Sequence, residues 1–117
     1  MRELPMSEDS LVAGLMDAFA LYEWEAWHVR RSDRALLMGR PGWPDITALP
    51  PGPGPLLVIE AKTKTGRATS NQARWLVRLH QVGVTTALIR PADYDRAVGL
   101  IASKNSEAST WDWAFRP

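Results

Sequence analysis

The sequence predicts an α/β domain built on a mixed sheet, and three observations support this fold class. Helical and strand-like apolar patterns follow one another in the order α, β, β, β, α, β, α, which is typical of a sheet with helices packed on it. The 117 residues suit one compact core and leave no room for a second. A hydrophobic fraction of 45% and six tryptophans supply enough apolar surface to exclude a disordered chain.

The first helix is expected over residues 7–22. Ser7 is suited to cap it, and Glu8 and Asp9 fall in its first turn, where the helix dipole favours acidic groups. Apolar side chains recur at helical spacing through Leu11, Leu15, Ala18, Phe19 and Tyr22. This pattern indicates one inward-facing stripe.

A first strand is expected at residues 26–30, because this run is aromatic and β-branched. We expect Trp24 and Trp27 to lie in the core and His28 to be a hydrogen-bonded histidine of the sheet. Two more strands, 45–49 and 56–62, flank a turn rich in proline and glycine. The run 56–59 is apolar on both faces, which indicates a central strand.

The C-terminal half predicts a second helix, a fourth strand and a third helix. Thr69 or Ser70 caps the second helix and Gly83 ends it, with an inner face of Trp75, Leu76, Leu79 and Val82. Residues 84–89 form the strand, and Pro91 opens a helix that continues to about residue 102.

The remaining residues, 103–117, form a polar C-terminal tail. Its aromatic side chains either pack back onto the domain or contact a second copy of the chain (Trp111, Trp113 and Phe115). We therefore expect a single domain over 1–117 with a core over about 7–102.

Composition excludes several kinds of site. Without cysteine there is no disulfide framework, thiol nucleophile or cysteine-ligated zinc, and the two histidines are too few for a histidine-rich metal centre. No apolar run approaches the roughly 20 residues that span a bilayer. We expect a cytoplasmic protein that does not bind membranes.

The net charge of +1 conceals an uneven distribution. Residues 1–29 carry one basic and six acidic side chains, whereas residues 61–92 carry six basic side chains and no acidic one. Eleven of the 14 basic residues are arginine, whose planar fork matches phosphate oxygens. Two interpretations remain open, an ordinary solvated surface and a phosphate-binding one.

The proline turn predicts a cluster of charged residues. If the hairpin is symmetric about the turn, Asp45 stands opposite Glu60, and the alternation of the strand places Lys62 on the face of Glu60. Protonation, an arginine partner or a hard cation such as Mg²⁺ relieves such a pair of carboxylates. A salt-bridged strand edge is the alternative interpretation of Glu60 and Lys62.

Gln72 lies on the sheet-facing stripe of the second helix, three, four and seven residues before Trp75, Leu76 and Leu79. Either it makes an ordinary hydrogen bond, or it reaches a water or phosphate beside the carboxylates.

Taken together, these motifs resemble the VRR-NUC branch of the PD-(D/E)XK, restriction-endonuclease-like superfamily. The resemblance extends from about residue 8 to residue 100. Its elements are Gly42-Trp-Pro-Asp45, Ile59-Glu-Ala-Lys62, Gly66, Gln72, Trp75-Leu76, Leu79, Gly83 and Arg90-Pro-Ala-Asp93. The implied fold is a restriction-endonuclease-like core.

The resemblance also implies the residues of a site. Asp45 and Glu60 would bind Mg²⁺ or Mn²⁺ with the backbone carbonyl of Ala61, Lys62 would be the catalytic lysine, and Gln72 would support the site. An acidic residue of the first helix is implied as well. Glu8 is our choice, since it stands three and seven residues before Leu11 and Leu15. Asp9 and plain helix capping remain alternatives.

Single-domain members of this branch are structure-specific DNA nucleases, often homodimers, that act on branched DNA such as four-way junctions. The resemblance therefore implies a metal-dependent endonuclease that reads DNA backbone and shape. Candidate phosphate contacts are Arg30, Arg31, Arg34, Lys64, Arg67, Arg74 and Arg78. Of these, Arg74 and Arg78 are equally suited to be solvated charge. The alternatives are a non-catalytic nucleic-acid-binding module and a sequence-specific restriction-type endonuclease on the same fold.

Overall fold

The structure is a computed structural model that describes residues 6–29 and 39–117. Its elements follow the predicted order, with a fourth helix and two short 3₁₀ helices added. They are α1 (Glu8–Leu21), β1 (Glu25–His28), β2 (Ile46–Leu49), β3 (Leu57–Ala61), α2 (Ser70–Gln81), β4 (Thr85–Ile89), η1 (Pro91–Asp93), α3 (Tyr94–Ala102), α4 (Ala108–Trp111) and η2 (Asp112–Ala114).

The four strands form one mixed sheet in the order β1-β2-β3-β4. Both β1 with β2 and β2 with β3 pair antiparallel, whereas β3 and β4 pair parallel. In the hairpin, Ile46 pairs with Ile59 and Thr47 with Val58, which is the register that a symmetric proline turn predicts. Every residue of β3 is buried, so the prediction of a central strand is confirmed.

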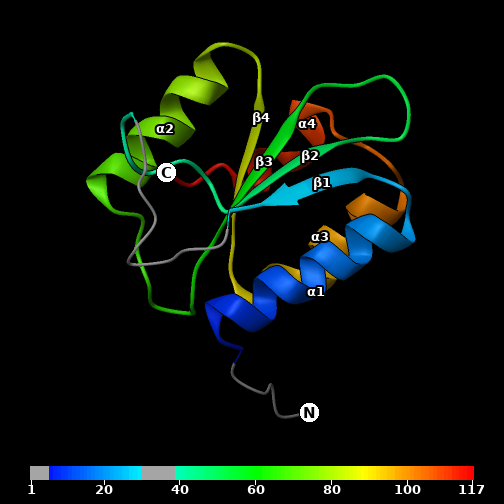
Figure 1. Cartoon of the computed structure of the whole chain (residues 1–117), viewed down its shortest axis with the longest axis horizontal. Coiled ribbons are helices and arrows are strands. Elements are labelled where there is room, and N and C mark those ends of the chain that lie inside the picture. The colour runs from blue at the N-terminus through cyan, green and yellow to red at the C-terminus, as the bar shows by residue number, and fades with distance from the viewer. Residues whose placement is uncertain (1–5, 30–38) are drawn as a thin grey trace.

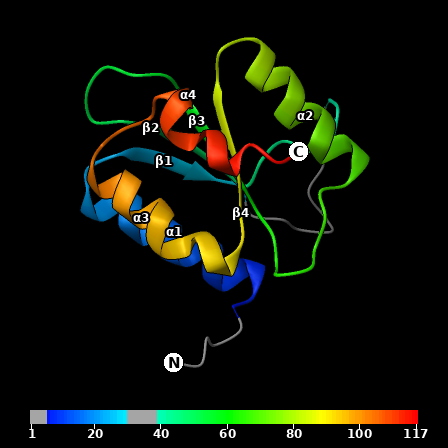
Figure 2. The same ribbon diagram turned by 180° about the vertical axis from the view of Figure 1, so that it is seen from behind.

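Helices cover both sides of the sheet. Figures 1 and 2 show α1 and α3 side by side along one face, with α2 on the other side. The core lies between α1, α3 and the sheet, where Leu11, Leu15 and Phe19 are fully buried. Local caps begin the helices as predicted: Ser7 Oγ accepts from the Ser10 amide, and Thr69 forms a capping box with Gln72.

Two predicted core positions are wrong. Trp27 is 60% exposed and Val82 is 70% exposed, whereas Trp24 is buried as expected. Trp27 lies on β1, an edge strand, and α2 packs against β4 at the opposite edge. No described helix therefore covers the face of β1 that carries Trp27. Val82 is the C-cap residue of α2, one position after the helix ends.

The C-terminal segment packs back onto the domain. Trp111 is fully buried, and its Nε1 donates to the Asn105 carbonyl at 2.8 Å. Trp113 lies beneath the guanidinium of Arg96, 4.2 Å from ring centroid to Cζ, and Phe115 stacks on His80. The core thus includes residues beyond 102. Among the described residues, no helix is long and apolar enough to cross a membrane.

Candidate metal centre

Charged side chains meet at one edge of the sheet, where β2 begins and β3 ends. Asp45 immediately precedes β2, Glu60 is the penultimate residue of β3, and Lys62 follows that strand. Glu8 is the first residue of α1. The hairpin register brings the first three together, and the packing of α1 on the sheet adds the fourth.

The carboxylate of Asp45 is held in place by the neighbouring strand. The Ala61 amide donates to Asp45 Oδ2 at 2.8 Å. The backbone carbonyl of Asp45 accepts from His28 Nδ1 at 2.9 Å and from the Val29 amide at 3.2 Å. His28 is therefore the hydrogen-bonded sheet histidine that we predicted, and its bond fixes the residue that precedes β2.

One carboxylate oxygen each from Glu8, Asp45 and Glu60 lies within 4.8 Å of the other two. Glu60 is fully buried, Asp45 is 7% exposed, and the side chain of Glu8 is 37% exposed. Lys62 Nζ lies 3.5 Å from Glu60 Oε2 and 4.0 Å from Glu8 Oε1. Three ionised carboxylates and one ammonium carry a formal charge of −2.

This donor set suits a hard divalent cation. Carboxylate oxygens are the ligands that Mg²⁺ and Mn²⁺ prefer, and a charge of +2 balances the cluster. The mixed burial also fits, because Glu8 leaves the cluster open to solvent while Glu60 closes its inner side. The residues present can therefore hold such an ion.

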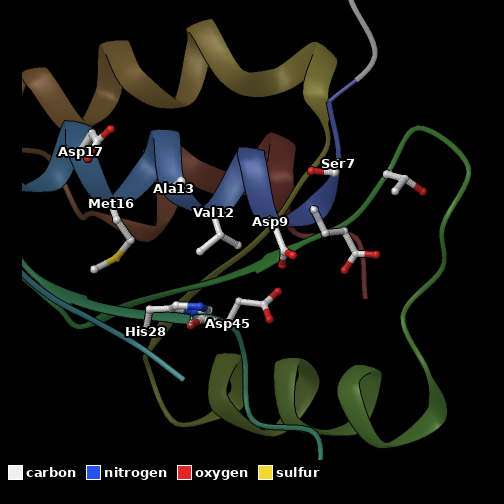
Figure 3. A pocket seen from close by; sticks show the side chains of 10 residues that line it. Ser7, Asp9, Val12, Ala13, Met16, Asp17, His28 and Asp45 are labelled. Atoms are coloured by element: carbon white, nitrogen blue, oxygen red, sulfur yellow. Dashed lines mark hydrogen bonds between the residues drawn. The ribbon is translucent and has the colours of Figure 1, made fainter. Parts of the chain in front are cut away.

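The cluster opens into an acidic cleft of about 970 Å³ between α1 and the sheet. Figure 3 shows Asp9 extending from α1 toward Asp45, with His28 beside Asp45 on the sheet side of the cleft. Asp17 lines the same cleft farther along α1. Asp9 thus faces the site, but Glu8 is the α1 residue whose oxygen falls within the 4.8 Å cluster.

A second cleft, of about 740 Å³, lies on the other side of Asp45. It is lined by aromatic and small side chains of β1, the segment before β2 and the start of α2, among them Trp27, Trp43 and Gln72. Asp45 borders both clefts. We call this second space the tryptophan cleft.

Gln72 is buried, and its Oε1 accepts from the Thr69 amide at 2.9 Å. The side-chain oxygen of Gln72 therefore makes an ordinary hydrogen bond, which is one of the two roles that the sequence left open. The residue also borders the tryptophan cleft beside Asp45.

The basic residues separate into two groups. Lys64 and Arg67 are exposed on the loop after β3, and Arg74 and Arg78 are exposed on α2. Arg78 donates to Gln81 Oε1 at 3.0 Å, a contact within its own helix. The candidates Arg30, Arg31 and Arg34 lie outside the described residues.

Arg90 is a residue of the site region to which the sequence assigned no role. It directly follows β4, and its Nη1 donates to the Thr63 carbonyl at 2.7 Å and to the Gly66 carbonyl at 2.6 Å. These bonds fasten the loop that follows Lys62. A sequence signal was available, because parallel strands end at the same edge and Arg90 therefore ends beside Lys62.

The structure is a mixed α/β domain with a candidate metal centre at one edge of its sheet, and comparison with known proteins makes the fold more specific. No protein-family model and no curated protein matches the sequence. A solved VRR_NUC domain matches the structure with a TM-score of 0.60 and 17% identity, over 80% of this chain and 92% of that one. The chain therefore has the fold of a VRR-NUC domain, as its motifs predict.

Proposed function

We propose that the protein is a metal-dependent nuclease that hydrolyses phosphodiester bonds in DNA. The observation that carries this proposal is the cluster of Glu8, Asp45 and Glu60 with Lys62 at its side. A buried cluster of acids is a poor place for a phosphate unless a cation neutralises it. The likeness to a VRR_NUC domain supports the same activity.

In this proposal Glu8, Asp45, Glu60 and the Ala61 carbonyl hold Mg²⁺ or Mn²⁺. Such an ion would polarise a phosphoryl oxygen and lower the pKa of the water that attacks the phosphorus, so that the P–O bond to the leaving strand breaks. The Ala61 amide keeps Asp45 oriented toward the cluster. Because the Lys62 amide donates to the Ile89 carbonyl, the strand alternation turns the backbone groups of Ala61 away from β4, toward Asp45.

Lys62 is the proposed catalytic lysine. Its ammonium is almost fully buried, so its charge is weakly screened and is held at one place beside the carboxylates. There it stabilises the negative charge that develops on the phosphate, and it requires no reorganisation to do so. Gln72 supports the site from the start of α2, where its Oε1 accepts from the Thr69 amide and both residues line the tryptophan cleft together with Asp45.

The proposed substrate is branched DNA, read through its backbone and shape. Exposed Lys64 and Arg67 extend the positive charge from Lys62 along the loop after β3, where phosphates of a bound strand are expected. Arg30 and Arg31 belong to the proposal through the sequence alone.

The test is cleavage of linear, flapped, nicked and four-way-junction DNA with Mn²⁺, with Mg²⁺ and with EDTA. We expect the wild type to cut a branched substrate only with a cation, and Asp45→Asn to lose at least about 100-fold in rate. Asparagine still accepts the Ala61 hydrogen bond, so the fold should persist in a thermal melt. Asp17→Asn, from the same cleft but outside the cluster, is the matched control.

Wild-type cutting by Asp45→Asn would overturn the assignment. DNA binding without cleavage of any substrate would favour a non-catalytic module, and a single cut pattern on plain duplex would favour a restriction-type enzyme.

A further inference from the structure

The tryptophan cleft has aromatic walls that the metal centre does not explain. Trp27, which is 60% exposed, lies on the face of β1 that no described helix covers. Its partner across the strands is Thr47, so the two side chains share that face. Trp43 lines the same cleft, a few residues before β2. The exposed indole of Trp27 and the indole of Trp43 therefore line the same cleft.

The second indole is fixed in orientation. Trp43 Nε1 donates to Thr47 Oγ1 at 2.9 Å, and its ring meets the edge of Trp75, with centroids 5.1 Å apart and planes at 70°. Trp75 Nε1 in turn donates to the Pro41 carbonyl at 2.9 Å. An indole held in this way needs little ordering when a flat ligand reaches it, which favours binding.

The polar groups around these rings indicate the ligand. Arg40 brings positive charge to the cleft, and the amides of Asn71 and Gln72 lie at the start of α2. Asp45 joins the cleft to the metal centre. A nucleobase has two π faces that suit the aromatic walls and a polar edge that suits the amide groups. It is also attached to a phosphate, which suits the positive charge of Arg40.

We propose that the tryptophan cleft binds one unpaired base of a nucleic-acid strand, next to the phosphate at the metal centre. This inference rests on the proposed function for its substrate class, and it adds a reason for preferring branched DNA. A single-stranded flap exposes unpaired bases, whereas base pairing and stacking in a blunt duplex withhold them. Trp27 stacks on the base, and Trp43 forms the adjoining wall.

The experiment measures equilibrium binding in EDTA, where no cleavage can occur. Fluorescence anisotropy compares a duplex with a single-stranded flap and a blunt duplex of equal length. Trp27→Ala should weaken flap binding by about 5- to 150-fold, the usual effect of removing one stacked base, and Trp27→Phe should restore most of it. Blunt-duplex binding should change by less than about two-fold.

Leu49→Ala is the matched control. Leu49 lies on the same sheet face, at the other end of the β1 and β2 ladder, and is 46% exposed. If loss of apolar surface alone weakened binding, Leu49→Ala would act like Trp27→Ala. A 2-aminopurine in the flap gives a direct readout, since stacking on indole should quench it in the wild type and leave it bright in Trp27→Ala.

Equal losses on both DNAs, or no loss, would overturn the proposal. So would light scattering in which Trp27→Ala turns a dimer into a monomer, because a second copy of the chain would then occupy the cleft. Selective flap binding by a protein that never cuts would keep this inference while removing the nuclease assignment.

Discussion

The two clefts beside Asp45 differ in almost every physical property. The cleft against α1 is acidic, with Glu8, Asp9 and Asp17 along one helix. The tryptophan cleft is lined by indole rings and amides, with Asp45 as its acidic member among the described residues. One carboxylate therefore separates a space that attracts cations from a space that accepts flat apolar groups.

This difference suggests a division of roles. The acidic cleft should repel DNA phosphates until a cation compensates its charge, whereas a base should enter the tryptophan cleft with or without metal. Chemistry should depend on the first cleft and strand placement on the second. Substitutions that affect one cleft should leave the other intact.

The largest effect is expected from Lys62→Met. The substitution removes a buried ammonium whose Nζ lies 3.5 Å from Oε2 of buried Glu60. Loss of one partner of a buried ion pair typically costs about 3–5 kcal/mol in unfolding free energy, and loss of the charge should lower the cleavage rate by about 100- to 1,000-fold. Urea denaturation in EDTA and single-turnover cleavage measure the two effects.

Two controls accompany this variant. Lys64→Met removes the same charge from an exposed position two residues away and should alter stability by less than about 0.5 kcal/mol. Mn²⁺ should recover part of the stability lost in Lys62→Met, because the cation replaces the missing positive charge. Unchanged stability together with full activity would show that the charge of Lys62 neither stabilises the carboxylate cluster nor assists cleavage.

Much of this site followed from the sequence because strand geometry is periodic. A turn that is symmetric about its prolines fixes the hairpin register, and the register places Asp45 beside Glu60 and Lys62 on the same face. The spacing of Glu8 from Leu11 and Leu15 favoured it over Asp9, and Glu8 is the α1 residue whose oxygen falls within the cluster. The spacing did not predict that Asp9 also faces the same cleft, because that depends on how α1 packs on the sheet.

The errors have a similar cause. An aromatic strand residue indicates an apolar face but does not say whether a helix covers it, and Trp27 proved exposed because α2 packs at the opposite edge of the sheet. Val82 continues the apolar spacing of α2 into its C-cap, where it is exposed. Coverage of a face is a tertiary property, so local patterns carry no signal for it.

A smaller effect, confined to the tryptophan cleft, is expected from Gly42→Ala. Gly42 has φ +107°, and a Cβ there would lie 2.6 Å from the Asn71 carbonyl carbon. The backbone strain alone costs about 1–3 kcal/mol. The start of α2 must also move away from Trp43. Thermal melts should show the loss, and flap binding should weaken while Mn²⁺ affinity, measured by calorimetry, stays at the wild-type value.

Gly52→Ala provides the comparison for that variant. Gly52 lies in the exposed proline turn, where a methyl group would meet no atom within 4 Å and φ is not positive. The substitution should be neutral or slightly stabilising, because alanine restricts the unfolded chain. A Gly42→Ala protein with wild-type stability would mean that the loop before β2 yields easily and does not shape the cleft.

The smallest effect separates phosphate contacts from solvated charge outside both clefts. Arg67 and Arg78 are both exposed, but Arg67 belongs to the loop that Arg90 fastens beside the metal centre, whereas Arg78 contacts Gln81 on its own helix. If Arg67 meets a phosphate, Arg67→Ala should lower the slope of log affinity against log salt by about 0.9, which is roughly five-fold in affinity at 0.15 M salt.

Arg78→Ala should leave that slope unchanged, because no phosphate is expected at its position on the outer face of α2. Salt titrations of duplex binding in EDTA measure both slopes, and equal slopes would place Arg67 among the solvated charges. Among the described residues, Lys62, Lys64 and Arg40 would then remain as basic groups near the two clefts, and the orientation of the strand would depend more on the stacked base.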